Sequence, residues 1–298
     1  MTNRRNFIRY VGAAAVAATA PLSAYAESHS CLRARPIPGT DELLPVIGMG
    51  NTGPFNAGDA KASWNVIRMF QKYGSRYIDC GDPGMFTVAE LVREHDLKDD
   101  VFLGTYFSVG EQTAARAAAG RLLRITGKPA LDLMHGYADH ALSNWDTFRR
   151  FKDDGLTRYI GVARHRKEYY EAMMKLMSTG TVDFVQLNYS LMETEAEERI
   201  LPMARDLGVA VITNRPFING AYFDVVRGHE LPAWAAEFDC DSWAQFSLKF
   251  IVSHPAINCV LTETANPNHA VDNLGAGFGR LPDATMRKRM LKTIRELG

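Results

Sequence analysis

Short apolar stretches alternate with longer amphipathic stretches along the chain after residue 34. Eight of the short stretches have the character of strands, at residues 45–49, 77–79, 101–105, 130–134, 159–162, 184–187, 210–213 and 259–261. Helical patterns cover residues 59–73, 111–125, 144–154, 167–177, 195–207, 242–253 and 283–297, the last of which we expect to pack on the outside of the domain. Such alternation is typical of βαβ units around a parallel sheet. Eight units predict an α/β protein of the (β/α)8 or TIM barrel class.

The composition fits one globular domain. The chain has 298 residues, 46% of them hydrophobic, and its 34 Lys and Arg balance its 34 Asp and Glu. Barrels commonly contain about 250 residues as one unit, so we expect residues 27–298 to form a single domain. A chain without net charge has no broad attraction to phosphate backbones or anionic lipid. The composition therefore argues against nucleic acid and anionic lipid as partners.

The first 26 residues have the pattern of a targeting segment. Arg4 and Arg5 precede an apolar run at residues 11–20, and small residues lead up to Ala26. We interpret residues 1–26 as a twin-arginine signal peptide that is cleaved after Ala26. The apolar run is far shorter than the roughly 20 residues that span a bilayer. The pattern predicts a periplasmic protein that has the twin-arginine export machinery as a partner and no membrane anchor once the signal is removed.

The four cysteines are scattered along the chain, at Cys31, Cys80, Cys240 and Cys259. None belongs to a Cys-x-x-Cys pair, which indicates core residues rather than a disulfide framework or a metal site. If a disulfide forms, we expect it between Cys31 and Cys240.

The chemistry of such a barrel lies where its strands end, at the C-terminal face. Polar residues at these strand ends include Asp79, Tyr106, His135, Arg164, Asn188, Asn214, Arg215 and Glu263. Several also suit a structural role: Asp79 can cap the turn after its strand, and Tyr106 can simply line a pocket. His135 can bond to the backbone, in which case His140 would be the pocket histidine. The spacing of His135, Asp139 and His140 fits no zinc pattern, so we predict no metal site.

Five stretches at the strand positions resemble the aldo/keto reductases, and more closely a branch of that family with twin-arginine signals. They are PVIGMG at 45–50, RYID at 76–79, GLTRYIGV at 155–162, DFVQLNYS at 183–190 and NRPF at 214–217. The stretches follow the family's order and span nearly all of residues 27–298. The resemblance implies a (β/α)8 barrel that reduces a small carbonyl compound with a nicotinamide cofactor.

The family's catalytic set consists of an Asp, a Tyr, a Lys and a His, and this chain matches it only in part. Asp79 matches the Asp, whereas the place of the Tyr falls on Gly84, or on Phe86 if a short insertion precedes it. Neither can donate a proton. Tyr106 stands where the Lys is expected, and because a neutral Tyr carries no charge, Asp79 loses its cationic partner. The resemblance thus implies a degenerate tetrad, with Tyr106 as the hydroxyl nearest the lost site.

The family's His is also displaced. His135 lies two residues before the expected position, which Tyr137 occupies. We name Asp79, Tyr106 and His135 as the candidate catalytic residues.

The positions of the family's cofactor site are only partly matched in this chain. Those that favour a retained NAD or NADP site are Gln186, Asn188, Pro216, Phe217 and Asn273. Two features argue against such a site. Ala163 and Arg164 stand where the family has Ser-Asn, or Thr-His in the exported branch. Residues 262–269, where the family binds the adenosine phosphate, contain Glu263 and no Lys or Arg.

Three functions fit these residues. The first is an exported aldo/keto reductase-like oxidoreductase. The second is a non-redox lyase or isomerase on the same barrel, and the third is a non-catalytic binding protein for a small molecule. The family match favours the first, whereas the altered tetrad and Glu263 favour the other two.

Overall fold

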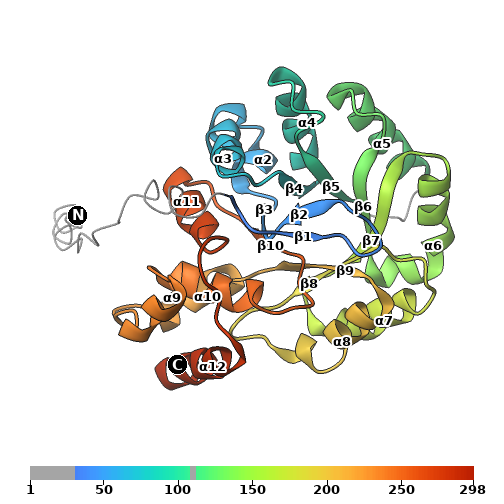
Figure 1. Ribbon diagram of the computed structural model, residues 1–298. Helices are drawn as coiled ribbons and strands as arrows, with labels where there is room; N and C mark the ends of the chain where they lie inside the picture. The colour runs from blue at the N-terminus through green and yellow to red at the C-terminus, as the bar shows by residue number, and fades with distance from the viewer. Residues whose placement is uncertain (1–30, 108–111) are drawn as a thin grey trace, which may run out of the picture.

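Eight parallel strands close into a barrel (Figure 1). The computed structural model describes residues 31–107 and 112–298, so the predicted signal peptide lies outside the described residues. Around the barrel the order is β10-β3-β4-β5-β6-β7-β8-β9. The strands are β3 (Ile47–Met49), β4 (Tyr77–Gly81), β5 (Phe102–Phe107), β6 (Leu131–Tyr137), β7 (Thr157–Ala163), β8 (Phe184–Asn188), β9 (Ala210–Asn214) and β10 (Cys259–Thr262). Each overlaps a predicted strand, and the predicted barrel class is confirmed.

Helices cover the outside of the barrel (Figure 1). They are α2 (Gly53–Ala57), α3 (Ala60–Lys72), α4 (Gly84–Glu94), α5 (Gln112–Thr126), α6 (Ala138–Asp153), α7 (Tyr170–Met177), α8 (Ile200–Leu207), α9 (Ala221–Val225), α10 (Trp243–Val252), α11 (Pro267–Gly275) and α12 (Ala284–Leu297). The last helix packs on the barrel's outside as predicted, since it buries Met290 and Ile294. No helix in the described residues has the length and apolar character to cross a membrane.

The first predicted strand, at residues 45–49, is wrong in one respect. It divides at Val46 into β2 (Leu43–Pro45), which pairs antiparallel with β1 (Ala34–Pro36), and the barrel strand β3. Pro45 has no N–H to donate, which confines it to the margin of a ladder. The chain therefore turns into the barrel only after this proline.

The helix predictions differ from the structure in two ways. Helix α6 begins well before the predicted start at residue 144, and Asn144 marks a break inside it, with φ −129°. Helices α2, α4, α9 and α11 were not predicted. In α4 the apolar residues Met85, Val88, Ala89 and Val92 recur at helical spacing and are buried. The adjoining Asp82-Pro83-Gly84 turn signal hid that periodicity.

The barrel interior has its own apolar core. Tyr77, Phe102 and Phe184 lie in it, with ring centroids 5.3 Å apart for Tyr77 and Phe102 and 6.1 Å apart for Phe102 and Phe184. Ile37 and Leu44, from the β1–β2 hairpin, join this core at the N-terminal end. The hairpin therefore closes the bottom of the barrel, which leaves the opposite end for a site.

Three of the four cysteines are core residues, as predicted. Cys80, Cys240 and Cys259 are buried and Cys31 is exposed. All four are free, so Cys31 and Cys240 do not pair.

Candidate functional site

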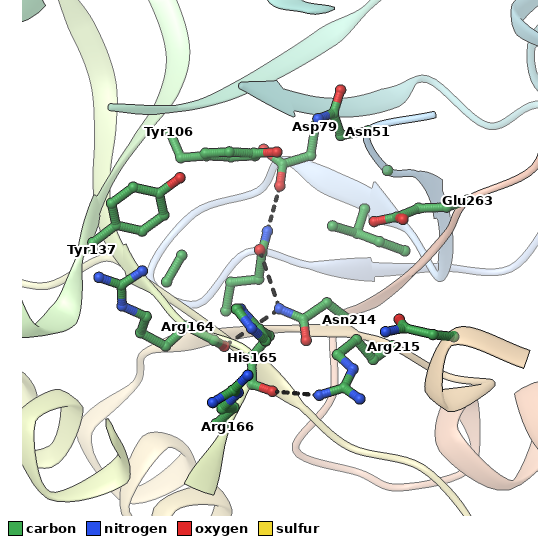
Figure 2. Close-up of a pocket in the computed structure, with 15 residues that line it drawn as sticks. Asn51, Asp79, Tyr106, Tyr137, Arg164, His165, Arg166, Asn214, Arg215 and Glu263 are labelled. Atoms are coloured by element: carbon green, nitrogen blue, oxygen red, sulfur yellow. Dashed lines mark hydrogen bonds between the residues drawn. The ribbon is translucent and has the colours of Figure 1, made fainter. Parts of the chain in front are cut away.

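A cavity of about 430 Å³ opens at the C-terminal ends of the strands (Figure 2). Every barrel strand, or the loop directly after it, contributes to its wall. The lining residues are Gly50, Asn51, Asp79, Tyr106, Tyr137, Ala163, Arg164, His165, Arg166, Gln186, Asn214, Arg215, Asn219, Leu261 and Glu263. This is the position at which barrel proteins bind ligands, and the strand-end rule identifies it from the sequence.

Asp79 of β4 is the buried acid of this pocket. The Nε2 atom of Gln186 donates a hydrogen bond to its Oδ2 atom, while its Oδ1 atom has no hydrogen-bond partner in the structure. Among the described residues the only basic side chain within 4.0 Å is His135. Burial raises the pKa of Asp79 to about 7, the bond from Gln186 opposes this rise, and repulsion from Glu263 adds to it. Asp79 therefore titrates near neutral pH.

The ring of Tyr106, on β5, lies over Gly81 of the neighbouring strand β4. Tyr106 pairs in register with Gly81, and a Cβ atom at Gly81 would lie only 2.1 Å from the Tyr106 ring. A glycine is therefore required for the ring to lie there. Figure 2 shows the Tyr106 hydroxyl pointing toward Asp79. Burial, and next the charge of Asp79, raise the pKa of Tyr106 well above its usual value, so this hydroxyl keeps its proton at neutral pH.

His135 does not line the pocket, contrary to the role we named for it. It is fully buried in β6, with its Nε2 atom 3.9 Å from Asp79 Oδ1, and burial lowers its pKa to about 3. The reason is that β6 runs three residues beyond the predicted strand. Alternate residues of a strand share a face, so Leu133 lies in the barrel core, His135 lies above it, and Tyr137 reaches the pocket.

The other proposed positions of family residues lie outside the pocket wall. Gly84 begins α4, and Phe86 packs under the guanidinium of Arg121, at 4.1 Å. His140 lies on α6, half exposed, and pairs at 3.6 Å with Asp139. Tyr106 and Tyr137 are the two tyrosines in the pocket wall.

Of the predicted cofactor residues, Gln186 alone lies in the pocket wall. Its Oε1 atom also accepts a bond from Asn214, at 3.4 Å. Asn188 lines an adjoining cavity of about 330 Å³ and donates to Glu193 at 2.9 Å. The remaining three, Pro216, Phe217 and Asn273, are placed by packing and do not appear in the pocket wall.

Those three residues hold the surrounding elements together. The carbonyl of Pro216 accepts a hydrogen bond from Ser247 at 2.9 Å. The Phe217 ring packs on Phe223, with centroids 4.8 Å apart. Asn273 is buried in α11. The same helix is tied to α10 by Asp272, which accepts bonds from Ser242 and Gln245.

Charged residues on the loops after β7, β9 and β10 complete the pocket. Arg164, Arg166 and Arg215 line one side, and Glu263 lines another. Burial raises the pKa of Glu263. The strand-end rule finds Arg164, Arg215 and Glu263 in the sequence but not Arg166, which comes later in its loop. No cluster of three or more His, Cys, Asp or Glu that would hold a metal occurs within residues 31–107 and 112–298.

The closed barrel and its pocket define the class: an α/β barrel protein with a ligand site at the C-terminal face. A family model described as the aldo/keto reductase family matches residues 46–290. The chain belongs to the aldo/keto reductase family. This membership confirms the prediction of an oxidoreductase of the NAD(P)-dependent carbonyl-reducing type.

Solved structures of the family share the fold at low sequence identity. An aldo/keto reductase from Klebsiella pneumoniae, solved with NADP and acetate, is 17% identical with a TM-score of 0.67, over 86% of this chain and 94% of that one. An aldo/keto reductase from Brucella melitensis is 18% identical with a TM-score of 0.68, over 88% of this chain and 99% of that one. No curated protein matches the chain in sequence. At this identity the structural likeness supports the fold.

Proposed function

We propose that the chain reduces a small carbonyl compound with a nicotinamide cofactor and that Asp79, rather than a tyrosine, provides the proton. The observation that carries this proposal is a buried carboxyl group in the pocket wall without a Lys or Arg within 4.0 Å in the described residues. In the family pattern a Lys keeps this Asp charged. Here Tyr106 stands in the place of the Lys, and we infer a catalytic set that has changed from that pattern.

Proton transfer to the carbonyl oxygen is the step this chain's own residues perform. A proton donor works best when its pKa lies near the working pH, and the pKa of Asp79 is about 7. The Tyr106 hydroxyl, with its raised pKa, is suited to donate a hydrogen bond that orients the carbonyl oxygen. After the transfer Asp79 is an anion, which Gln186 stabilises through its Nε2 hydrogen bond until solvent restores the proton.

The residues at the pocket fit part of a nicotinamide dinucleotide. Such a cofactor supplies a hydride to the carbonyl carbon. Gln186 and Asn214 offer amide groups for the nicotinamide end, and Arg215 lies on the loop that corresponds to the family's pyrophosphate segment. The adenosine end lacks a cation, because residues 262–269 contain no Lys or Arg and Glu263 points into the pocket (Figure 2).

We expect NADPH to bind no better than NADH. A charge-assisted hydrogen bond to a phosphate is worth about 1.5–3 kcal/mol, so one such bond would give NADPH an advantage of tenfold or more. The test is a fluorescence titration of the mature protein with both cofactors. Similar dissociation constants support the proposal; a strong preference for NADPH would show that another residue binds the extra phosphate. No binding of either at millimolar concentration would refute a nicotinamide-dependent reaction.

A second function follows from the same carboxyl group. An acid with a pKa near 7 both gives and takes protons, which suits a non-redox elimination or isomerisation. This function requires no cofactor. The titration above separates the two, since a protein that binds neither NADH nor NADPH but retains Asp79-dependent chemistry would be a lyase or isomerase.

We also propose that the protein is exported to the periplasm by the twin-arginine pathway, on the strength of Arg4, Arg5 and the short apolar run after them. Because this pathway carries folded proteins, the cofactor would be loaded before export.

Replacing both Arg4 and Arg5 with Lys should leave an unprocessed precursor in the cytoplasm, because the pathway requires the arginine pair. Cell fractionation and the mass of the protein in each fraction measure this. Arg9→Lys, outside the pair, is the control and should export normally. A mature protein beginning at Glu27 in the periplasm of the double variant would refute this route.

A further inference from the structure

Several buried polar atoms in the barrel beneath the pocket have no hydrogen-bond partner in the structure. They include Asp79 Oδ1, the Tyr77 hydroxyl oxygen and both ring nitrogens of His135. The exposed fraction is 1% for Asp79 and 0% for Tyr77 and His135. Buried polar groups of native proteins are nearly always paired, and a group that is left over often has a functional role. The three side chains are therefore candidates for a shared role.

The strand register brings these three side chains together. Tyr77 and Asp79 alternate along β4, so both face the barrel interior, and Asp79 is the one nearer the pocket. Asp79 pairs with Gly104 of β5, where a Cβ atom would lie 2.5 Å from Asp79 Oδ1 and 2.9 Å from the Tyr77 hydroxyl oxygen. On the next strand, His135 Nε2 lies 3.9 Å from the same Asp79 oxygen. The glycine thus leaves room for the two oxygens to lie over β5, beside His135.

The two oxygens of Asp79 have different surroundings. Oδ2 accepts the hydrogen bond from Gln186, which lines the pocket, whereas Oδ1 lies on the side of Tyr77 and His135. When Asp79 gives up its proton, Oδ1 becomes a buried, charged acceptor, which is unfavourable without a donor. The Tyr77 hydroxyl is such a donor, and so is His135 in the tautomer that carries its proton on Nε2.

Both donors are neutral at the pH at which Asp79 titrates. Burial raises the pKa of Tyr77 and lowers the pKa of His135 to about 3. Burial is also the main cause of the raised pKa of Asp79, and the Gln186 amide and the Tyr77 hydroxyl oppose it. The other titratable groups that interact with the charge of Asp79 are Cys80 on β4, Tyr106 on β5, Tyr137 on β6, Cys259 on β10 and Glu263 after β10.

We propose that Tyr77 and His135 are positioning residues for the proton transfer, which hold Asp79 from beneath by donating hydrogen bonds to its ionised Oδ1. This inference rests on the proposed reduction, because it concerns the group that we assign as the proton donor. Neither residue lines the pocket. By stabilising the anion, the two donors make Asp79 a stronger acid than burial alone would allow, and they keep Oδ2 directed at the pocket.

The first test is Tyr77→Phe, which removes the hydroxyl and keeps the ring that packs against Phe102. The pKa of Asp79 should rise by about one unit, from about 7 to about 8, since the ionised form loses a donor. NMR spectroscopy of the protein with isotope-labelled Asp carboxyl carbons measures this, and the resonance missing from Asp79→Asn identifies Asp79. Tyr159→Phe is the matched control, because the Tyr159 hydroxyl donates to Glu42 at 3.0 Å, and it should leave the titration unchanged.

A matched pair of variants tests His135. Met and Gln have similar size, but only Gln carries an N–H donor at its end. We expect His135→Met to raise the pKa of Asp79 and His135→Gln to keep it closer to about 7. If these buried variants do not fold, Tyr77→Phe decides the proposal by itself.

The pH dependence of kcat/KM connects the titration to the reaction. In Tyr77→Phe the decline with rising pH should move from about 7 to about 8, because protonated Asp79 persists to higher pH. The affinity for NADH should not change. A rate reduced by the same factor at every pH, with an unchanged Asp79 titration, would overturn the proposal, since the hydroxyl would then only support the structure.

The failure of the proposed reduction has a different signature. If the pKa of Asp79 rises in Tyr77→Phe and His135→Met but the pH profile of reduction does not follow it, the contacts beneath Asp79 are supported and Asp79 is refuted as the proton donor. An Asp79 titration that one of these variants leaves unchanged would overturn the role of the residue replaced in it.

Discussion

Asp79→Asn should lower kcat/KM for carbonyl reduction by about 10²–10⁴, the usual contribution of a positioned acid. Asn has nearly the shape of Asp and can still accept the hydrogen bond from Gln186, but it cannot transfer a proton. The affinity for NADH should stay nearly unchanged, because Asp79 acts on the substrate. Steady-state kinetics and the cofactor titration give both quantities.

The stability of the same variant provides a control for folding. Burial raises the pKa of Asp79 to about 7 in the folded protein, above the value of an unfolded chain. The folded state therefore binds this proton more tightly, and the stability it provides is present at low pH and lost as the pH rises through 7. Asp79→Asn should accordingly raise the melting temperature more at pH 8 than at pH 4.

A second variant identifies which group is the acid. Tyr106→Phe removes the hydroxyl that we assign to orientation, and its effect should be near tenfold, the value of one hydrogen bond. If Tyr106→Phe abolishes reduction while Asp79→Asn retains most of it, Tyr106 is the proton donor and our assignment is wrong.

The fold is readable from the sequence because its signals are local and repeated. Each barrel strand is an apolar run of several residues, and each is followed by an amphipathic helix, so one missed element does not change the class. The errors occur where a local signal conflicts with a longer pattern. Pro45 divides a continuous apolar run, and the Asp82-Pro83-Gly84 turn hides the helix that begins at Gly84.

The residues of the site can be predicted from the sequence only as accurately as the positions at which the strands end. Asp79 and Tyr106 were found because their strands end soon after them. In β6 an error of three residues assigned the pocket position to His135, which is buried beneath Tyr137. The pKa of Asp79 depends on Gln186 and Glu263, which come from other strands and loops, and sequence spacing does not reveal these contacts.

The strongest test of the proposed chemistry restores the family's lysine. Tyr106→Lys would place an ammonium group beside Asp79, and Gly81, which has no side chain, leaves room for the lysine chain where the Tyr106 ring now lies. A cation within about 4–6 Å lowers the pKa of a carboxyl group by roughly 1–3 units. We therefore expect the pKa of Asp79 to fall from about 7 to well below neutrality.

The pH dependence of reduction should move with it. Because the reaction uses protonated Asp79, the wild-type kcat/KM should decline as the pH rises through about 7. In Tyr106→Lys this decline should begin at lower pH, so that at pH 7 most molecules lack the proton and the rate is lower. Tyr106→Met, which removes the ring without adding charge, is the matched control and should keep the decline near 7. The shift belongs to Asp79 only if Asp79→Asn, made in the Tyr106→Lys background, removes the pH dependence. An unshifted profile would mean that the proton comes from another group.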